Sequence, residues 1–287
     1  MTSGRLRADS DGMAVQMSKL IMGSFPELRF EPTDKRVRAV SAGRTFADSR
    51  RARLVWEPRR VVASYAVPEE DLAATVEVTV AAEAEEHPVV MSAGGPPVLD
   101  PRTPFAVHSS DGDPVSLTAD GIDLPGAGFR LVDPELAGYV VLDFAAFDTW
   151  LEEDEPIVSH PRDPFSRIDV RRSSSHVQVE VEGVTVADTT NARLLFETHI
   201  TPRYYLPRDD VHLDLLTPTD TRTTCAYKGH ATYWAIEVGG VQRDIAWTYE
   251  EPLPDAAAIT KHVAFFDEHV DLVLDGERRA RPVTPWS

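Results

Sequence analysis

The sequence predicts a mainly β protein, built from two tandem copies of a small antiparallel β-barrel or sandwich-like module, each with a short helix. Three observations support this fold class. A segment near the N-terminus recurs in the second half of the chain. Apolar residues alternate with polar ones in short runs, as they do in half-buried strands. Turn signals that contain glycine follow these runs closely, which is typical of sheets connected by hairpins.

The internal repeat relates residues 37–57 to residues 177–197. Nine of the 21 aligned positions are identical, namely Val, Gly, Thr, Ala, Asp, Ala, Arg, Leu and Glu. With a slip of one residue, the likeness continues from residues 65–68 to residues 204–207. Self-similarity of this kind indicates two copies of one structural unit.

The second copy shows the strand pattern most clearly. Over residues 176–182, Val177, Val179 and Val181 fall on one face of a strand, and Gly183 follows where the chain must turn. Further strands are expected at residues 184–187, 194–197, 211–216, 225–238, 241–249 and 270–274, the segment 225–238 as one long strand or a bulged pair.

Turn and helix signals complete the second copy. Gly239-Gly240 predicts a hairpin, because paired glycines tolerate the positive φ angles of a primed turn. Two prolines just before residues 256–261 favour a short helix there, since proline is tolerated near a helix start. The counterpart of this helix and of the last strand in the first copy is expected within residues 133–155.

The chain is expected to divide into three parts. Residues 1–35 form an N-terminal extension, residues 36–160 a first, degenerate module, and residues 161–287 a second module that carries the candidate site. The boundary falls in the segment His-Pro-Arg-Asp-Pro at residues 160–164, where two prolines interrupt regular structure.

Composition excludes several classes of function. The 287 residues include 29 Lys and Arg against 47 Asp and Glu, a formal charge of −18. This charge argues against nucleic-acid binding, which needs clustered basic side chains, and against binding to an anionic membrane surface. The single cysteine excludes an intrachain disulfide. Because no segment resembles a signal peptide or a membrane span, a cytoplasmic location is expected.

Polar and aromatic side chains are densest in residues 224–234 of the second copy. This segment contains Lys228, one of four lysines in a chain that otherwise uses arginine. The nearest segment of the first copy, residues 103–109, has no lysine, no thiol and no aromatic pair, and His108 is its candidate for the place of Lys228. We therefore expect the functional site in the second copy.

Several motifs of the second copy carry a family resemblance. They include Ala-Asp-Thr at residues 187–189, Tyr-Tyr-Leu-Pro at 204–207, Cys-Ala-Tyr-Lys-Gly at 225–229 and Trp-Thr-Tyr-Glu at 247–250. Together they resemble the bacterial domain of unknown function 427, from Arg167 to about Arg281, whereas the first copy matches well only in its first third. The resemblance implies a compact β-rich fold and no established reaction. The family's nucleotidyltransferase-like label finds no support here, because the phosphate-binding motifs and a basic patch are absent from the sequence.

Lys228 and Glu197 are the first candidates for catalysis. If burial lowered its pKa, Lys228 could act as a nucleophile or base, whereas as a cation it could hold a carboxylate or phosphate. The alternative is a structural ion pair with Glu197. Glu197 recurs as Glu57 in the first copy, which favours a structural role, but it also stands at a strand end where it could accept a proton or fix Lys228.

Cys225 is the third catalytic candidate. It could act as a nucleophile only if a nearby cation favoured its thiolate, and strict strand alternation places it opposite Lys228 unless a bulge near Gly229 intervenes. The alternative is a small buried apolar residue. Aromatic side chains of the same copy are expected either to pack in the core or to line a ligand pocket. The candidate ligand-binding residues are Tyr205, Tyr227, Tyr233, Trp234, Trp247 and Tyr249.

Two hypotheses about function follow. The first is a module that binds a small polar or anionic metabolite in a pocket of the second copy, or an enzyme that turns such a molecule over. The second is a non-catalytic structural or interaction protein that presents an acidic duplicated scaffold, with Lys228 and Glu197 locked together and no cavity beside them. The histidines lack the spacing of a metal site, so neither a metal nor a cofactor is expected.

Overall fold

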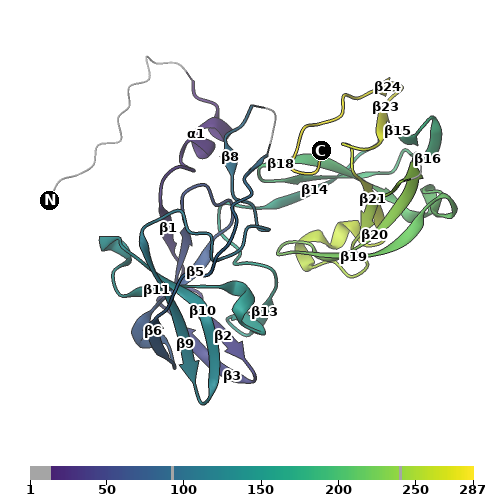
Figure 1. The fold of residues 1–287 in the computed structure, drawn as a ribbon. Coiled ribbons are helices and arrows are strands. Elements are labelled where there is room, and N and C mark those ends of the chain that lie inside the picture. Colours follow the sequence, from purple (N-terminus) through teal and green to yellow (C-terminus); the bar gives the residue numbers. More distant parts are fainter. Residues whose placement is uncertain (1–13, 92–93, 239–240) are drawn as a thin grey trace.

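The computed structural model describes residues 14–91, 94–238 and 241–287, and its architecture is mainly β. Each half of the chain forms one larger and one smaller antiparallel sheet (Figure 1). We call strands β1 to β13 and their connections the first half, and strands β14 to β24 and their connections the second half. The predicted fold class is confirmed in its sandwich-like form, since the described edge strands of each sheet are not paired with one another.

The first half contains three sheets. Its seven-stranded sheet has the order β1 (Arg29–Pro32), β4 (Arg53–Trp56), β5 (Ser64–Pro68), β11 (Tyr139–Leu142), β10 (Ile122–Leu131), β9 (Gly112–Ala119) and β6 (Thr75–Val78). Its four-stranded sheet has the order β13 (Glu155–Ile157), β12 (Thr149–Glu152), β2 (Val37–Ser41) and β3 (Arg44–Ser49). A small hairpin pairs β7 (Val89–Val90) with β8 (Pro97–Val98).

The second half repeats the two main sheets. Its seven-stranded sheet has the order β14 (Ile168–Arg172), β17 (Arg193–Glu197), β18 (Ile200–Pro207), β22 (His262–Phe265), β21 (Val241–Thr248), β20 (Gly229–Val238) and β19 (Thr217–Cys225). Its four-stranded sheet has the order β16 (Val184–Thr189), β15 (Val177–Val181), β23 (Asp271–Leu274) and β24 (Glu277–Arg278).

The strands of the two halves correspond one to one along the chain and across each main sheet. The registers agree as well, because Leu54 pairs with Tyr65 in the first half and Leu194 pairs with Tyr204 in the second. The residues of the first pair align with those of the second in the sequence repeat, once its slip of one residue is taken into account. β1 lies within the predicted N-terminal extension and pairs with β4, so the first sheet begins before residue 36.

Helices are few and short. The one α-helix among the described residues, α1 (Met17–Gly23), has no buried residue. The helix expected at residues 256–261 is a 3₁₀ helix, Pro254–Ile259, and its counterpart Pro134–Leu136 in the first half is capped by Asp133. The remaining 3₁₀ segments are Glu69–Asp71, Phe144–Ala146, Arg208–Asp210 and Leu213–Leu215. The last of these replaces the strand expected at residues 211–216, so that prediction was wrong.

The strand expected over residues 225–238 is interrupted. β19 ends at Cys225 and β20 begins at Gly229, with which Cys225 pairs, so residues 226–228 form the loop of a tight hairpin. Gly229 has a φ of +94°, a conformation that side-chain-bearing residues rarely adopt, and this explains why a glycine ends the loop. The predicted Gly239-Gly240 hairpin lies outside the described residues.

The second half packs on both faces of its larger sheet. One cluster fills the space between its two sheets and includes Val179, Leu206 and Trp234. A second cluster lies on the opposite face and includes Tyr205, Trp247 and Tyr249. A third joins the two halves, since Phe25 and Met91 pack near Ile200. The face that carries Tyr205 is thus turned toward the first half, and this arrangement creates the cavity described next.

Candidate functional site

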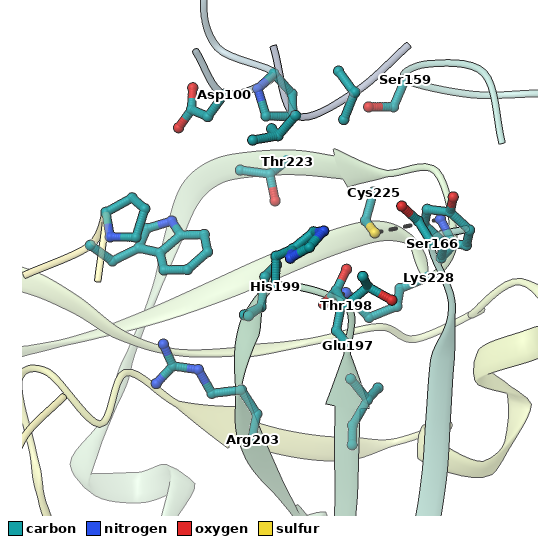
Figure 2. Close-up of a pocket in the computed structure, with 18 of the residues that line it drawn as sticks. Asp100, Ser159, Ser166, Glu197, Thr198, His199, Arg203, Thr223, Cys225 and Lys228 are labelled. Atoms are coloured by element: carbon teal, nitrogen blue, oxygen red, sulfur yellow. Dashed lines mark hydrogen bonds and ion pairs between the residues drawn. The ribbon is translucent and has the colours of Figure 1, made fainter. Parts of the chain in front are cut away.

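A cavity of about 330 Å³ lies on the outer face of the second half's larger sheet. Its floor is formed by β17, β18, β20 and β21, and loops of the first half cover it with Asp100 and Ser159 (Figure 2). Lys228, Glu197 and Cys225 all line this cavity. The structure therefore brings the three predicted catalytic candidates together.

Lys228 lies at the end of the hairpin loop between β19 and β20. The Lys228 carbonyl accepts a hydrogen bond from the Leu253 backbone N–H at 3.1 Å, which fixes the loop. Only 6% of Lys228 is exposed, and its ammonium group donates to Glu197 Oε2. Burial acts to lower the pKa of Lys228, but the Glu197 carboxylate outweighs this effect and the pKa is raised. Lys228 is therefore a buried cation at neutral pH.

Glu197 is placed by a two-residue turn. It is the last residue of β17 and pairs with Ile200 at the start of β18, so Thr198 and His199 form the turn. His199 adopts a φ of +65° there. Among the described residues, Glu197 Oε2 has the Lys228 ammonium as its hydrogen-bond partner and Oε1 has none. One carboxylate oxygen thus retains its capacity to accept a hydrogen bond.

Cys225 lies on the same side as Lys228. Strict alternation predicts opposite sides, but the three-residue loop turns the chain so that both side chains line the cavity. Cys225 Sγ accepts the backbone N–H of Tyr227 at 3.5 Å, as the dashed line in Figure 2 marks. The thiol is half-buried.

Several tyrosines and tryptophans line the cavity. Trp247 Nε1 donates to the Tyr205 hydroxyl at 3.2 Å, and Tyr233 stacks on Phe266 with ring centroids 6.4 Å apart. Burial raises the pKa of Tyr205, Tyr233 and Tyr249, so these phenols stay uncharged. Tyr249 is 5% exposed, and its hydroxyl has no hydrogen-bond partner in the described part of the chain.

Tyr227 is at the rim of the cavity. Its hydroxyl donates to Asp163 Oδ2 at 3.4 Å, and the Arg162 guanidinium lies 5.0 Å from its ring centroid. Burial raises the pKa of Tyr227 to about 12. Tyr227 therefore connects the cavity to the segment between the two halves.

Trp234 does not line the cavity, although it was predicted to be one of the ligand-binding residues. It lies in the cluster between the two sheets of the second half, on the opposite face from the cavity, and the Arg208 guanidinium lies 5.5 Å from its ring centroid. Simple alternation through residues 225–238 would place Lys228 and Trp234 on one strand face, but Lys228 belongs to the loop and precedes β20. Alternation along the strand then directs Tyr233 to the cavity and Trp234 to the core.

A second charged cluster, which the sequence patterns did not predict, lies on the cavity wall. Arg203 is buried and donates to Glu268 Oε2 at 2.9 Å and lies 3.4 Å from Asp267 Oδ2. Thr284 also donates to Glu268, which brings the C-terminal Trp286 to the cavity. Two features of the sequence could have indicated this cluster. One is an Asp-Glu pair directly after an apolar strand, and the other is an arginine before Tyr-Tyr.

Every cation that lines the cavity among the described residues has a carboxylate partner. Lys228 pairs with Glu197 and Arg203 with Glu268. Arg102 lies 2.6 Å from Asp100, and Arg167 lies 3.4 Å from Asp169. The two lining histidines are His160 and His199, and burial lowers the pKa of both. The cavity wall therefore carries no uncompensated positive charge at neutral pH.

The first half has a counterpart of this site in which the carboxylate is fully occupied. Glu57 Oε1 lies 2.9 Å from His108 Nδ1, and Oε2 accepts the backbone N–H groups of Ser109 and Ser110 at 2.9 and 3.2 Å. His108 therefore contacts Glu57 as Lys228 contacts Glu197. The His108 ring also stacks on Phe129, with centroids 3.5 Å apart.

The second half is a β sandwich-like domain with a cavity on the outer face of its larger sheet. Residues 169–276 match the family model of a domain of unknown function, DUF427, which is the resemblance predicted from the motifs of this part of the chain. Comparison with curated proteins gives no match. In the described residues no helix is long and apolar enough to cross a membrane, and no three His, Cys, Asp or Glu side chains converge as a metal site.

Proposed function

We propose that the cavity of the second half binds a small organic molecule. The supporting observation is a set of unfilled hydrogen-bonding positions within aromatic walls, formed by Lys228, Glu197 Oε1 and the Tyr249 hydroxyl. Ligand sites are typically concave and mostly apolar or aromatic, with a few polar groups that fix the ligand, and this cavity fits that description. The volume of about 330 Å³ falls in the range of small-molecule sites.

Lys228 serves binding rather than covalent catalysis in this proposal. An amine must be neutral to attack a carbonyl carbon or to accept a proton. The pKa of Lys228 is raised by Glu197, so neutral amine is scarce at physiological pH. The ammonium instead donates hydrogen bonds to an acceptor on the ligand, while Glu197 holds it in place.

The two-copy organisation belongs to the same proposal. We infer that the halves are tandem copies of one module, because their strand orders and registers agree. In this account one copy keeps an open site and the other has closed it with His108 and two backbone N–H groups.

A structural role for the Lys228–Glu197 pair is the alternative. It is favoured by the ion pair itself, which a purely structural role also predicts. That role does not require a cavity beside the pair, nor a Tyr249 side chain that lines this cavity. The ligand-binding proposal accounts for all three features.

The test is a ligand screen on a pair of variants at one position. Cys225→Phe adds a ring within the cavity, whereas Cys225→Ser keeps the size of the side chain, and circular dichroism checks that both fold. Small aromatic and polar compounds are screened by saturation-transfer NMR. Compounds that bind the wild type and Cys225→Ser but not Cys225→Phe support the proposal. Binding that is the same for all three proteins, or no binding at all, contradicts it.

A further inference from the structure

We propose that the ligand of this cavity is a neutral planar molecule with a cyclic amide edge, that is, an N–H donor beside a C=O acceptor on a ring. The inference rests on the proposed function, because it names the chemical class that the same cavity accepts. Its observations are the charge balance of the wall, the positions left open for hydrogen bonds, and the aromatic lining.

Charge balance disfavours an anion. The Lys228 ammonium is already neutralised by Glu197, and Arg203 by Glu268. A ligand carboxylate or phosphate would therefore add an uncompensated negative charge in a buried, aromatic cavity. Burying such a charge costs far more free energy than burying a neutral polar group that is hydrogen-bonded.

A ligand cation is disfavoured by the same wall. It would lie near the Lys228 ammonium, which is held inside the cavity, and like charges in a buried site repel strongly. The faces of two indole rings are also engaged, because the Arg203 guanidinium lies 5.9 Å from the ring centroids of Trp247 and Trp286. The usual aromatic cage for a cation is thus already filled by an arginine.

The open hydrogen-bonding positions match an amide. Lys228 has two further ammonium hydrogens to donate, and Glu197 Oε1 can accept one hydrogen bond. The two groups are adjacent because they form an ion pair. A ring C=O would accept from Lys228 while the neighbouring N–H donates to Glu197, and Tyr249 could donate to the same carbonyl. No proton transfer is required.

The aromatic lining favours a flat ligand body. Tyr205, Tyr233 and Trp247 come from β18, β20 and β21 of the larger sheet, in which β22 separates β18 from β21, and all three line the cavity. Aromatic side chains pack well against the faces and edges of planar rings. The aromatic wall thus contacts the ring, while the Lys228–Glu197 pair forms hydrogen bonds with its polar edge.

The experiment compares four bicyclic probes of nearly one shape. They are 2-quinolone, N-methyl-2-quinolone, which lacks the donor, quinoline-2-carboxylate, which is an anion, and quinoline, which lacks the amide edge. Affinities are measured by NMR titration on wild type, Glu197→Gln and Tyr249→Phe. Glu250→Gln, at an exposed carboxylate that lies 2.7 Å from Arg208, is the matched surface control.

The wild type and Glu250→Gln should bind 2-quinolone about tenfold or more tightly than the other three probes, since one unmade buried hydrogen bond costs about that much. Glu197→Gln leaves the Lys228 charge unpaired and should shift the preference toward quinoline-2-carboxylate. Tyr249→Phe, which loses only a hydroxyl group, should weaken 2-quinolone several-fold and leave quinoline unchanged.

Two results would overturn the inference, and only the second would also overturn the proposed function. If quinoline or the carboxylate binds the wild type as tightly as 2-quinolone, the cavity binds small molecules but does not select an amide. If none of the four probes binds and the Cys225→Phe screen also finds no ligand, the proposed function fails with it. Should Glu197→Gln not fold, the probe series on wild type and Tyr249→Phe decides.

Discussion

Glu57 and Glu197 occupy the same place in the two halves of the molecule, but their surroundings differ. Glu57 receives three hydrogen bonds, from His108 and from two backbone N–H groups, which use both of its oxygens. Glu197 receives one, from Lys228, and lies beside a cavity. The first carboxylate is sealed into the fold, whereas the second keeps one oxygen available.

The difference shows how one scaffold position can serve structure or binding. A backbone N–H cannot move away from its acceptor without disturbing the fold, so Glu57 is permanently occupied. A lysine side chain has spare donors and brings a full charge. Replacing the segment around His108 by the hairpin loop around Lys228 therefore converts a closed carboxylate into an open polar pair. The predictions below test this contrast.

The largest expected effect is on stability when Lys228 loses its charge. Lys228→Met should lower the free energy of unfolding by about 3–5 kcal/mol, because it leaves a mostly buried Glu197 carboxylate without its partner. His108→Phe keeps a ring on Phe129 and leaves Glu57 its two backbone donors, so a loss of about 1–2 kcal/mol is expected. Chemical denaturation measures both.

A double variant is the control for this pair. Lys228→Met with Glu197→Met removes both charges and should recover most of the stability lost in the single variant. Equal losses for Lys228→Met and His108→Phe would show that the two carboxylates are held alike, against the contrast drawn here.

The next effect concerns pH and the cluster of Arg203, Asp267 and Glu268 on the cavity wall. Burial raises the pKa of Asp267 to about 6, so between about pH 4 and pH 6 the folded protein binds a proton that the unfolded chain has released. The contribution of Asp267 to stability therefore falls as the pH rises through this window. Asp267→Asn should remove this decline.

The measurement is chemical denaturation of the wild type and Asp267→Asn at several pH values from 4 to 7. The variant should gain stability relative to the wild type as the pH rises, and the difference should level off above pH 6. A constant difference across the range would mean that Asp267 keeps an ordinary pKa in the folded protein.

The smallest effect separates the two faces of the second half. Trp247→Phe and Trp234→Phe should each cost about 1–2 kcal/mol of stability, because both indoles are buried. Only Trp247→Phe should also weaken binding of a cavity ligand, since Trp247 lines the cavity and Trp234 lies on the opposite face. A binding loss in Trp234→Phe that equals that in Trp247→Phe would contradict this assignment. Paired denaturation and NMR titration decide it.

Much of the fold could be predicted because its signals are local. Alternation at Val177, Val179 and Val181 gave the strand and its buried face, and all three side chains are buried. The break at Lys228 could not be derived from periodicity, because Lys228 lies in the loop between β19 and β20 and its side chain does not follow the alternation of either strand. For this reason Trp234 was assigned to the wrong face.

The candidate site was predicted in its residue types but not in its setting. Pairing of Lys228 with Glu197 was one of two alternatives open from the sequence, and the fold shows the pair beside a cavity. The covering loops with Asp100 and Ser159 come from the first half, and Trp286 comes from the chain end. Contacts between such distant segments depend on how the halves pack, and local sequence patterns do not indicate this packing.

The most direct measurement is a crystal structure of the wild-type protein with 2-quinolone. The account predicts the probe in the cavity of the second half, with its carbonyl oxygen at Lys228 Nζ and its N–H at Glu197 Oε1, and no probe beside Glu57. A probe located elsewhere, or a cavity that holds only water at saturating probe, would contradict the claim that the second half keeps an open polar pair for a neutral ligand.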